Sequence, residues 1–376
     1  MGESGQLSIL HVSQPTEGGV GRYIADVVAD QAARGWDVTL ACPTYGDLAE
    51  EASAAGCRHV AWSAERAPGP GLALEARRIS RLTAETQPQL VHLHSSKAGL
   101  AGRLALRRRL PTIFQPHGWS FDASTGLVRA GAVAWERLAA RWATVILCVS
   151  EAERRRGEEH GLHASWRTIP NGVDIEAHRE AAEGERAAAR GRLELDDRPT
   201  VLCVGRLCRE KGQDILLDAW PDVLARVPEA LLVLVGDGRD AEAVRKRAGA
   251  GVWLAGWRTD VDDWLAAADV VAVPSRSDGM SVAMLEAMAR GRSVVAADVG
   301  GAAEALGDAG SLVPAEDPPA LAAAIAEQLL DPQQAAASGR AARQRAELLH
   351  DLKATTEALA GLYAELLSSS TEPTLP

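Results

Sequence analysis

Acidic side chains around one predicted helix have the types and spacing needed to bind a phosphorylated sugar. Asp278 and Glu286 stand eight positions apart, the first in a loop and the second in a helix predicted to start near Ser281. An apolar run, 269–273, precedes the loop and predicts a buried strand. Free backbone N–H groups at a helix start favour a phosphate or an anionic leaving group, and the carboxylates can accept hydrogen bonds from sugar hydroxyls.

Two cations flank a second loop. Arg206 and Lys211 follow a predicted strand that ends at Gly205. Arginine grips a phosphate through two parallel hydrogen bonds, and lysine acts as a mobile point charge. Together they are suited to neutralising a departing nucleoside diphosphate.

The histidines, aspartates and cysteines of the chain give little indication of a metal site. His92 and His94 lie two apart on a predicted strand and share a face, but the sequence indicates no third ligand, so a zinc site is rejected. Asp260 is better explained as a helix N-cap than as part of an Asp-x-Asp metal motif. No metal and no cofactor is therefore expected. The odd number of cysteines, with no Cys-x-x-Cys pair, predicts reduced core residues: Cys42, Cys57, Cys148, Cys203 and Cys208.

Strands and helices must hold these loops in place, and the chain shows an alternation of predicted strands and helices twice. Strands are predicted at 7–12, 38–42, 90–94, 112–115 and 145–149, with helices between them. The alternation restarts at Thr200, with strands at 201–204, 231–235, 251–255, 270–273 and 293–296. The fold class is therefore α/β, with two Rossmann-like doubly wound parallel sheets facing a cleft that binds ligands at the carboxyl ends of the strands.

The predicted domain boundaries follow from this restart. Residues 1–175 form an N-terminal Rossmann-like domain and residues 176–350 form a C-terminal Rossmann-like domain. Residues 351–376 comprise a last helical segment followed by a disordered tail after Ser368.

Charge and hydropathy limit the partners and the compartment. The net charge is −11, yet the stretch 76–110 holds eight basic residues against one acid. Either it is a solvated helix face, or it is a patch for anionic lipid head groups or a phosphate-bearing acceptor. The membrane contact would use Arg77, Arg78, Arg81, Arg103, Arg107, Arg108 and Arg109. Nucleic acid is disfavoured because interleaved aromatics and a binding module are missing. No apolar run is long enough to span a bilayer, and the acidic start at 1–6 is not a signal peptide, so we expect a cytoplasmic protein, with the inner membrane face as one possible location.

The motifs together resemble those of the retaining GT-B glycosyltransferases, the large fourth sequence family of these enzymes, and in particular its bacterial polysaccharide-assembly members. The match runs from the glycine loop at 18–21, through 94–99, His117 and 169–174, to the segment 286–291 and the last helix. One departure stands out. The family's first acid is a glutamate followed by Phe-Gly, whereas this chain has Asp278 followed by Gly279 and Met280.

The resemblance implies that the N-terminal domain binds the acceptor, that the C-terminal domain binds the nucleotide sugar, and that the last helix crosses back to the first domain. It also implies a role for each matching residue. Catalysis would involve Arg206, Lys211, Asp278 and His117. The donor would be bound by Gly19, Gly205, Gly279, Met280, Ser281 and Glu286, with Glu286 on the ribose and Asp278 on the transferred sugar. The acceptor would be contacted by Ser95, Ser96 and Lys97. Because aspartate is one methylene shorter than glutamate, we expect an unusual donor sugar or a shifted hydroxyl contact.

The function implied is retaining, metal-independent hexosyl transfer from a nucleotide-diphosphate sugar to a hydroxyl acceptor. A lipid-linked saccharide of cell-surface polysaccharide assembly is the expected acceptor, and a soluble secondary metabolite is an alternative. A non-hydrolysing nucleotide-sugar epimerase and a catalytically silent nucleotide-binding paralogue are the rivals from other classes. The sequence does not specify the nucleotide, the sugar, the linkage or the oligomeric state.

Overall fold

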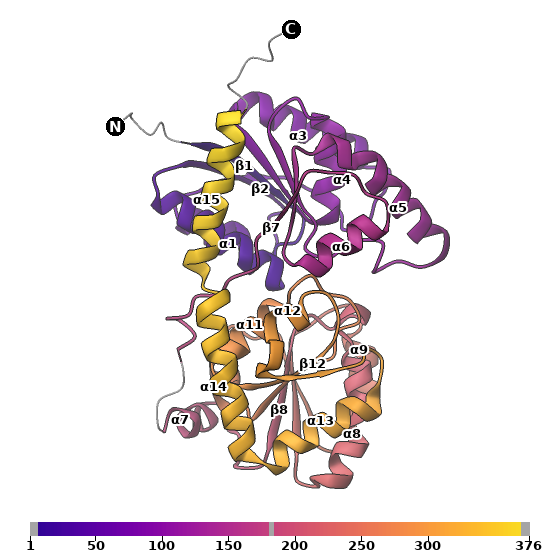
Figure 1. The fold of residues 1–376 in the computed structure, drawn as a ribbon, viewed down its shortest axis with the longest axis vertical. Coiled ribbons are helices and arrows are strands. Elements are labelled where there is room, and N and C mark those ends of the chain that lie inside the picture. Colours follow the sequence, from indigo (N-terminus) through magenta and orange to yellow (C-terminus); the bar gives the residue numbers. More distant parts are fainter. Residues whose placement is uncertain (1–6, 180–183, 370–376) are drawn as a thin grey trace. The chain divides into compact units, whose positions relative to one another are not determined.

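The computed structural model describes residues 7–179 and 184–369 (Figure 1). It divides into two compact units, the first comprising Met1–Asn171 with Lys353–Pro376 and the second Gly172–Leu352. The predicted boundaries at 175 and 350 lie close to these divisions. The tail was predicted to begin after Ser368, but Ser369 still belongs to the last helix, and the rest of the tail and the start at 1–6 lie outside the described residues.

The first unit contains a seven-stranded parallel sheet in the order β3-β2-β1-β4-β5-β6-β7. Its strands are β1 (Ser8–Ser13), β2 (Asp37–Cys42), β3 (Arg58–Ala61), β4 (Leu90–His94), β5 (Thr112–Gln115), β6 (Val145–Cys148) and β7 (Trp166–Thr168). Its helices are α1 (Gly18–Ala33), α2 (Leu48–Ala54), α3 (Leu72–Thr86), α4 (Ser95–Leu106), α5 (Gly126–Ala139), η1 (Ala140–Trp142), α6 (Glu151–Glu159) and α15 (Leu352–Ser369).

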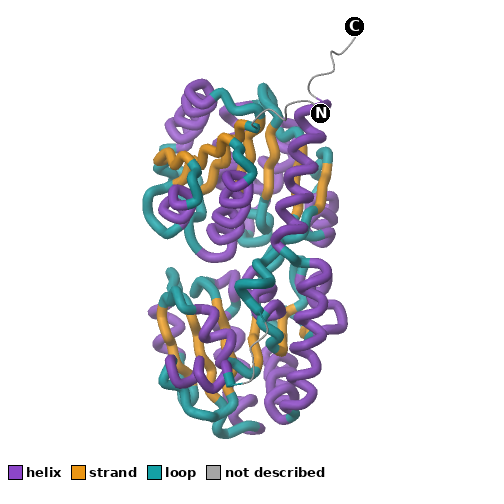
Figure 2. The backbone as a smooth tube through the Cα atoms, turned by 90° about the vertical axis from the view of Figure 1, so that its left-hand side faces the viewer, coloured by secondary structure: helices purple, strands orange, loops and turns teal. Residues whose placement is uncertain are grey.

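Helices cover both faces of this sheet (Figure 2). One face packs on α1, α2 and α15, and the other on α3, α4 and η1. Helix α15 contributes Leu359, Leu362, Tyr363 and Leu366 to the core of the first unit. The last helix thus returns to the first unit, as the sequence predicted.

The second unit repeats the arrangement with six parallel strands in the order β10-β9-β8-β11-β12-β13. Its strands are β8 (Thr200–Val204), β9 (Leu231–Val235), β10 (Val252–Gly256), β11 (Val270–Val273), β12 (Ser293–Ala297) and β13 (Ser311–Val313). Its helices are α7 (Glu185–Arg192), η2 (Arg209–Lys211), α8 (Gln213–Arg226), α9 (Ala241–Arg247), α10 (Val261–Ala267), α11 (Val282–Ala289), α12 (Ala302–Leu306), η3 (Gly307–Ala309), α13 (Pro318–Leu330) and α14 (Pro332–Leu349).

The predicted parallel sheets are therefore confirmed, and three strands were missed. β3, β7 and β13 lie at sheet edges and are only three or four residues long. Such short edge strands lack the continuous apolar run that marks a strand buried on both faces. All five cysteines are buried and unbridged, as expected. Within the described ranges, no helix has both the length and the apolar character to cross a membrane.

Candidate active site

Two loops meet at the carboxyl edge of the second sheet because β8 and β11 are neighbouring parallel strands. The loop after β8 carries Arg206 and Lys211, and the loop after β11 carries Asp278. Lys211 donates a hydrogen bond to Asp278 and forms an ion pair with it. Residues 67 positions apart in the sequence are thus brought into direct contact.

Glycines allow the close approach of these loops. Gly212 has φ +70°, and a Cβ there would lie 2.0 Å from the carbonyl oxygen of Pro274. A Cβ on Gly236 would lie 2.1 Å from the oxygen of Gly205, which explains why the turn after β9 also starts with glycine. The β8 loop is therefore pressed between the turns that follow β9 and β11, and any side chain at these positions would push them apart.

The cations of this edge differ in what they contact. Arg276 makes two hydrogen bonds to Asp214, at 2.6 and 2.8 Å, and a third to Glu316 at 2.7 Å. The hydrogen bonds to Asp214 raise the pKa of Arg276. They also connect the β11 loop to α8. Arg206 is exposed, and its guanidinium contacts no hydrogen-bonding or charged partner among the described residues. Arg206 is thus a cation that an incoming anion can reach.

The loop after β11 ends in the predicted helix start. Ser281 is the N-cap of α11, and its hydroxyl accepts a hydrogen bond from the backbone N–H of Met284 at 3.4 Å. Gly301 donates to the carbonyl of Gly279 at 2.6 Å, so the turn after β12 supports the loop. The predicted helix start near Ser281 is confirmed.

A small hollow lies beside Lys211, between the ends of β8 and β11. Its volume is about 10 Å³, and Ser275 and Ser281 contribute to its lining. The Ser275 hydroxyl is buried and has no hydrogen-bond partner among the described residues. Since a buried polar atom is normally paired, this hydroxyl is placed to bond a water molecule or a ligand atom at the edge of the sheet.

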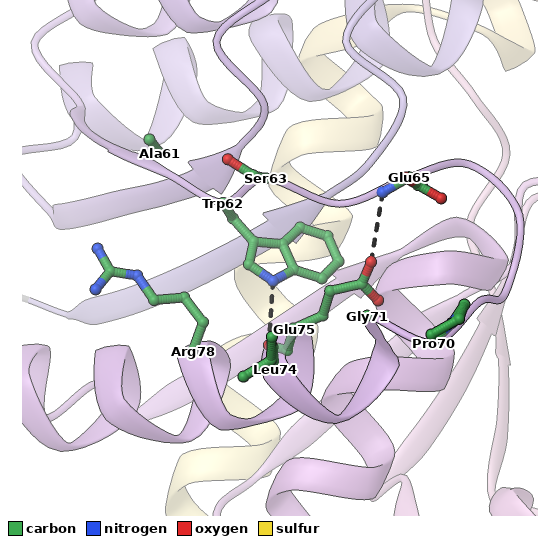
Figure 3. A pocket seen from close by; sticks show the side chains of 9 residues that line it. All are labelled: Ala61, Trp62, Ser63, Glu65, Pro70, Gly71, Leu74, Glu75 and Arg78. Carbon is green, nitrogen blue, oxygen red and sulfur yellow. Dashed lines mark hydrogen bonds between the residues drawn. The ribbon is translucent and has the colours of Figure 1, made fainter.

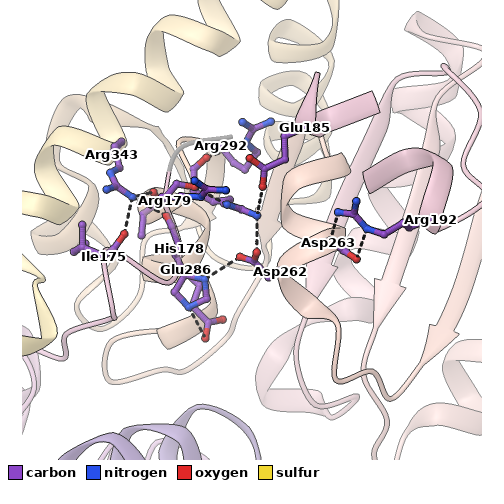
Figure 4. A network of polar contacts seen from close by, with 12 residues as sticks. Ile175, His178, Arg179, Glu185, Arg192, Asp262, Asp263, Glu286, Arg292 and Arg343 are labelled. Carbon is purple, nitrogen blue, oxygen red and sulfur yellow. Dashed lines mark hydrogen bonds and ion pairs between the residues drawn. The ribbon is translucent and has the colours of Figure 1, made fainter. Parts of the chain in front are cut away.

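Glu286 lies in the second turn of α11, as predicted, and 17% of its side chain is exposed. Its carboxylate is 3.9 Å from Nε2 of His178, whose Nδ1 is 3.1 Å from Asp262 (Figure 4). Arg290 holds Asp262 through an ion pair at 2.5 Å. Nothing in the sequence pattern indicated His178 as a neighbour of Glu286, because the two are far apart in the chain.

The Asp-x-Asp pattern is also explained by this network. Asp260 occupies the N-cap position of α10, as predicted, but its side chain makes no cap hydrogen bond. It accepts hydrogen bonds from Arg258 at 2.8 and 2.5 Å instead. Both carboxylates are therefore engaged by arginines.

In the first unit, the glycine loop lies within the first turn of α1 and not before it. The helix was expected from about Arg22 but begins at Gly18, which has φ +66°. Gly19 is exposed at this helix end. A Cβ on Gly21 would lie 2.8 Å from the carbonyl carbon of Thr16, so that position is needed for local packing.

His117 follows β5 and is only partly buried. Its φ is +54°, an unusual value for a residue other than glycine. Its Nε2 lies 3.1 Å from Nδ1 of His94, and burial lowers its pKa to about 3. Such backbone strain is typical of functional positions.

Ser95 and Ser96 lie at the start of α4 and are partly exposed, whereas Lys97 is buried. Ser95 has φ +58°. The Lys97 ammonium forms an ion pair with Glu75 at 2.8 Å and donates to the Ala67 carbonyl at 3.0 Å. Its charge is used inside the first unit, which leaves the two serines as the accessible members of the predicted acceptor set.

The basic patch needs one correction. Arg103 is fully buried, forms an ion pair with Glu136 at 2.8 Å and lies 3.8 Å from the ring centre of Phe114. Its inclusion in a membrane-facing surface was therefore wrong, because a charge paired in the core is unavailable to lipid. The other arginines of the patch are exposed: Arg77, Arg78, Arg81, Arg107, Arg108 and Arg109.

A pocket of about 680 Å³ lies where the chain leaves β3 and enters α3 (Figure 3). Trp62 forms part of its wall and donates a hydrogen bond to the Glu75 carbonyl at 3.2 Å. Arg78 and Glu65 bring charges of both signs to the rim. The pocket is large enough for a sugar-sized group, and Arg78 is the one lining residue that the sequence singled out, as part of the basic patch.

The sequence reasoning also missed His11. β1 pairs with β4 so that His11 faces His92, and both side chains are fully buried. One nitrogen from each of His11, His92 and His94 lies within 4.8 Å of the others. The missing third imidazole was thus supplied by a strand 81 residues away in the sequence, and only the sheet order reveals it.

Comparison with known families gives two matches. Residues 17–177 match the model described as Glycosyltransferase Family 4, and residues 198–331 match the model described as Glycosyl transferases group 1. The chain is 32% identical over 358 residues to a GDP-mannose-dependent alpha-(1-6)-phosphatidylinositol monomannoside mannosyltransferase of Mycolicibacterium smegmatis, covering 88% of this chain and 90% of that protein. It is 31% identical to an alpha-D-kanosaminyltransferase of Streptomyces kanamyceticus over 49% of this chain and 50% of that protein.

Solved structures have the same fold. The Anabaena protein HepE, crystallised with UDP and glucose, superposes with a TM-score of 0.82 at 23% identity, covering 96% of this chain and all of that one. A sucrose-phosphate synthase from Thermosynechococcus elongatus also superposes with a TM-score of 0.82 at 23% identity, covering 97% of this chain and 100% of that one.

Proposed function

Because this chain belongs to glycosyltransferase family 4 and has the GT-B fold, we propose that it is a retaining, metal-independent enzyme that moves a hexose from a nucleotide sugar to a lipid-linked acceptor. The membership makes it a glycosyltransferase that uses a nucleotide sugar. Retention, metal independence and the acceptor are the proposal.

One observation carries this proposal. At the carboxyl edge of the second sheet, the unpaired cation Arg206 lies on the same loop as Lys211, which pairs with Asp278. This loop and the start of α11 offer positive charge to a diphosphate without any need for a metal ion. The carboxylate of Asp278 holds the Lys211 ammonium until a phosphate competes for it.

The roles of the residues follow from their charges. Arg206 and Lys211 stabilise the negative charge that develops on the departing diphosphate. Once Lys211 turns to the phosphate, Asp278 is released to accept hydrogen bonds from the transferred sugar. Glu286, supported by His178, accepts hydrogen bonds from the ribose. Retention is proposed to follow from attack on the same face as departure, which asks little general-base help from the protein.

Relatives guide the choice of substrates. The relative that is 32% identical over most of its length is named for GDP-mannose and a phosphatidylinositol monomannoside. GDP-mannose and a glycosylated phospholipid are therefore the first donor and acceptor to test. The half-length match to a kanosaminyltransferase keeps a soluble amino-sugar acceptor as the alternative.

The test is a donor screen by thermal shift and by slow hydrolysis, with GDP-, UDP- and dTDP-sugars. Selective stabilisation by one donor, lost in Arg206→Ala, together with release of free sugar, supports the transferase. Product NMR of the anomeric linkage then decides retention, and a chelator decides metal independence. Stabilisation by a nucleotide sugar without any release of free sugar or transfer favours the silent-paralogue alternative, and no stabilisation by any nucleotide sugar refutes the donor site. Release of an epimer without an acceptor favours the epimerase.

A further inference from the structure

A continuous hydrogen-bonded series of side chains runs inward from His117. Nε2 of His117 lies 3.1 Å from Nδ1 of His94, and Nε2 of His94 lies 2.9 Å from Nδ1 of His11. Nε2 of His11 lies 2.8 Å from Oε1 of Gln31. We call His117, His94 and His11 the imidazole chain. It joins the loop after β5 to β4, β1 and α1.

The end of the imidazole chain fixes the direction of every bond in it. An amide oxygen only accepts hydrogen bonds, so Nε2 of His11 must carry the proton that it donates to Gln31. A neutral imidazole has one N–H, so Nδ1 of His11 accepts, and His94 must donate from Nε2. Because the single proton of His94 is on Nε2, its Nδ1 accepts a hydrogen bond, and His117 must donate that bond from its Nε2. Its Nδ1 is left as a lone-pair acceptor.

Burial keeps the imidazole chain neutral. His11 and His94 are fully buried, and desolvation lowers the pKa of His11 to about 4 and that of His94 well below its usual value. A protonated ring at His11 or His94 would offer two N–H groups where the neighbours leave room for one. His117 alone is partly exposed, and its Nδ1 has no hydrogen-bond partner within the described residues. The open end of the series is therefore an acceptor near the surface.

The ring geometry disfavours a metal site made from the same imidazoles. The rings of His92 and His94 stack with centroids 4.0 Å apart, and those of His11 and His94 are tilted by only 13°. A coordinated metal lies in the plane of each imidazole, so near-parallel stacked rings do not aim their nitrogens at one point. Nδ1 of His92 instead pairs with the hydroxyl of Tyr363 at 2.6 Å. His92 is thus beside the imidazole chain and not part of it.

We propose that His94 and His11 are positioning residues that hold His117 as a neutral imidazole protonated on Nε2, so that its Nδ1 accepts a hydrogen bond from a substrate hydroxyl. The part that concerns the substrate rests on the proposed function. The part that concerns the tautomer rests on this unit alone. Gln31, from α1, is the residue that sets the direction of the series.

The tautomer is measured directly on the wild-type protein. Histidine ring nitrogens labelled with ¹⁵N distinguish N–H from lone-pair nitrogen by chemical shift, and His117→Gln identifies the His117 signals. We expect a proton on Nε2 of His117 and no titration between about pH 5 and about pH 8, since its pKa is lowered to about 3. A proton on Nδ1, or titration near the ordinary histidine value, overturns the proposal.

A matched pair of substitutions separates positioning from packing. His94→Leu and His92→Leu change two fully buried residues of the same strand, and only the first removes the acceptor for His117. We expect His94→Leu to give His117 a mixed tautomer and to lower kcat for donor hydrolysis about tenfold, the loss of one hydrogen bond, with a nearly unchanged KM. His92→Leu should leave the tautomer and kcat as they are. His94→Asn, whose amide oxygen replaces the Nδ1 acceptor, should restore most of kcat.

The outcomes keep this inference distinct from the proposed function. Equal losses in the two leucine variants with an unchanged tautomer mean a packing role only and refute the inference. Stoichiometric metal in the purified protein, with histidine signals that shift on chelation, would establish a chelating set instead. If the wild-type protein turns over neither GDP-mannose nor UDP-glucose, the proposed function fails while the tautomer result stands.

Discussion

The two units share the order of six strands, but the corresponding strands carry different kinds of side chain, charged in the second unit and neutral in the first. β8 and β11 take the places in the second unit that β1 and β4 take in the first. The second unit has the Lys211–Asp278 ion pair and Arg206 there, whereas the first has neutral imidazoles linked by hydrogen bonds. The comparison teaches that the fold fixes where a site lies and the side chains decide what it binds.

The degree of burial explains why the second unit keeps charged side chains and the first unit keeps neutral ones. Charges in the second unit remain partly exposed, with 26% of Lys211 and 19% of Asp278 open to solvent. The strand histidines of the first unit are fully buried and neutral, because desolvation lowers their pKa values. A diphosphate needs cations near water, and a neutral sugar hydroxyl needs an oriented acceptor.

The sharpest way to break the comparison is to remove Arg206, a cation of the second unit whose guanidinium has no partner among the described residues. Arg206→Ala should lower kcat/KM roughly 10³-fold, about 4 kcal/mol, by exposing the diphosphate's charge in the transition state. Steady-state transfer or hydrolysis kinetics measure this. Arg209→Ala, an exposed arginine of the same loop, is the matched control and should change the rate less than about threefold. Equal rate losses in the two variants would mean that the loop acts through its overall positive charge and not through a specific contact of Arg206.

Corresponding glycines test how tightly the loop after the first strand is packed within each unit. Gly212 and Gly18 both have positive φ at the start of the helix that follows the first strand of their unit. A Cβ on Gly212 would lie 2.0 Å from the Pro274 oxygen, whereas a Cβ on Gly18 would meet nothing within 4 Å. Gly212→Ala should destabilise the fold by about 3 kcal/mol, and Gly18→Ala by about 1 kcal/mol from backbone strain alone. Urea unfolding measures both. A similar cost at the two positions would show that loop packing in the second unit is no tighter.

Acid should destabilise the first unit selectively. Between its ordinary pKa of 6.5 and its folded pKa of about 4, His11 binds a proton only when unfolded. Stability is therefore complete above the unfolded pKa and falls as the pH drops, by about 2 kcal/mol from about pH 7.5 to about pH 5 for His11 alone. Hydrogen exchange of β1 and β4, with β8 and β11 as the internal reference, reports this. Equal loss of protection in both sheets would contradict a histidine cause.

The smallest expected effect concerns the acid of the second unit. Asp278→Glu lengthens the side chain by one methylene while keeping its charge for Lys211. We expect donor preference to shift by up to about tenfold with little change in stability. Competition between pairs of nucleotide sugars measures the preference. An unchanged preference would sink the idea that the shorter acid selects the sugar.

The sequence by itself determined the repeated α/β pattern, the loop cations and the start of α11. These features are local: buried strands appear as apolar runs, and the helix start near Ser281 follows one of them. The contact between Lys211 and Asp278 was not readable in the same way, because it depends on β8 and β11 being neighbours. The family resemblance supplied their roles before any geometry was known.

Only the tertiary structure decided which charges are free and which imidazoles meet. Lys97 and Arg103 looked like surface cations, yet both are buried in ion pairs. His92 and His94 looked like an incomplete metal site until the strand order placed His11 beside them. The physical reason is the same in each case: burial and partners depend on pairings between segments far apart in the chain, and no local pattern records them.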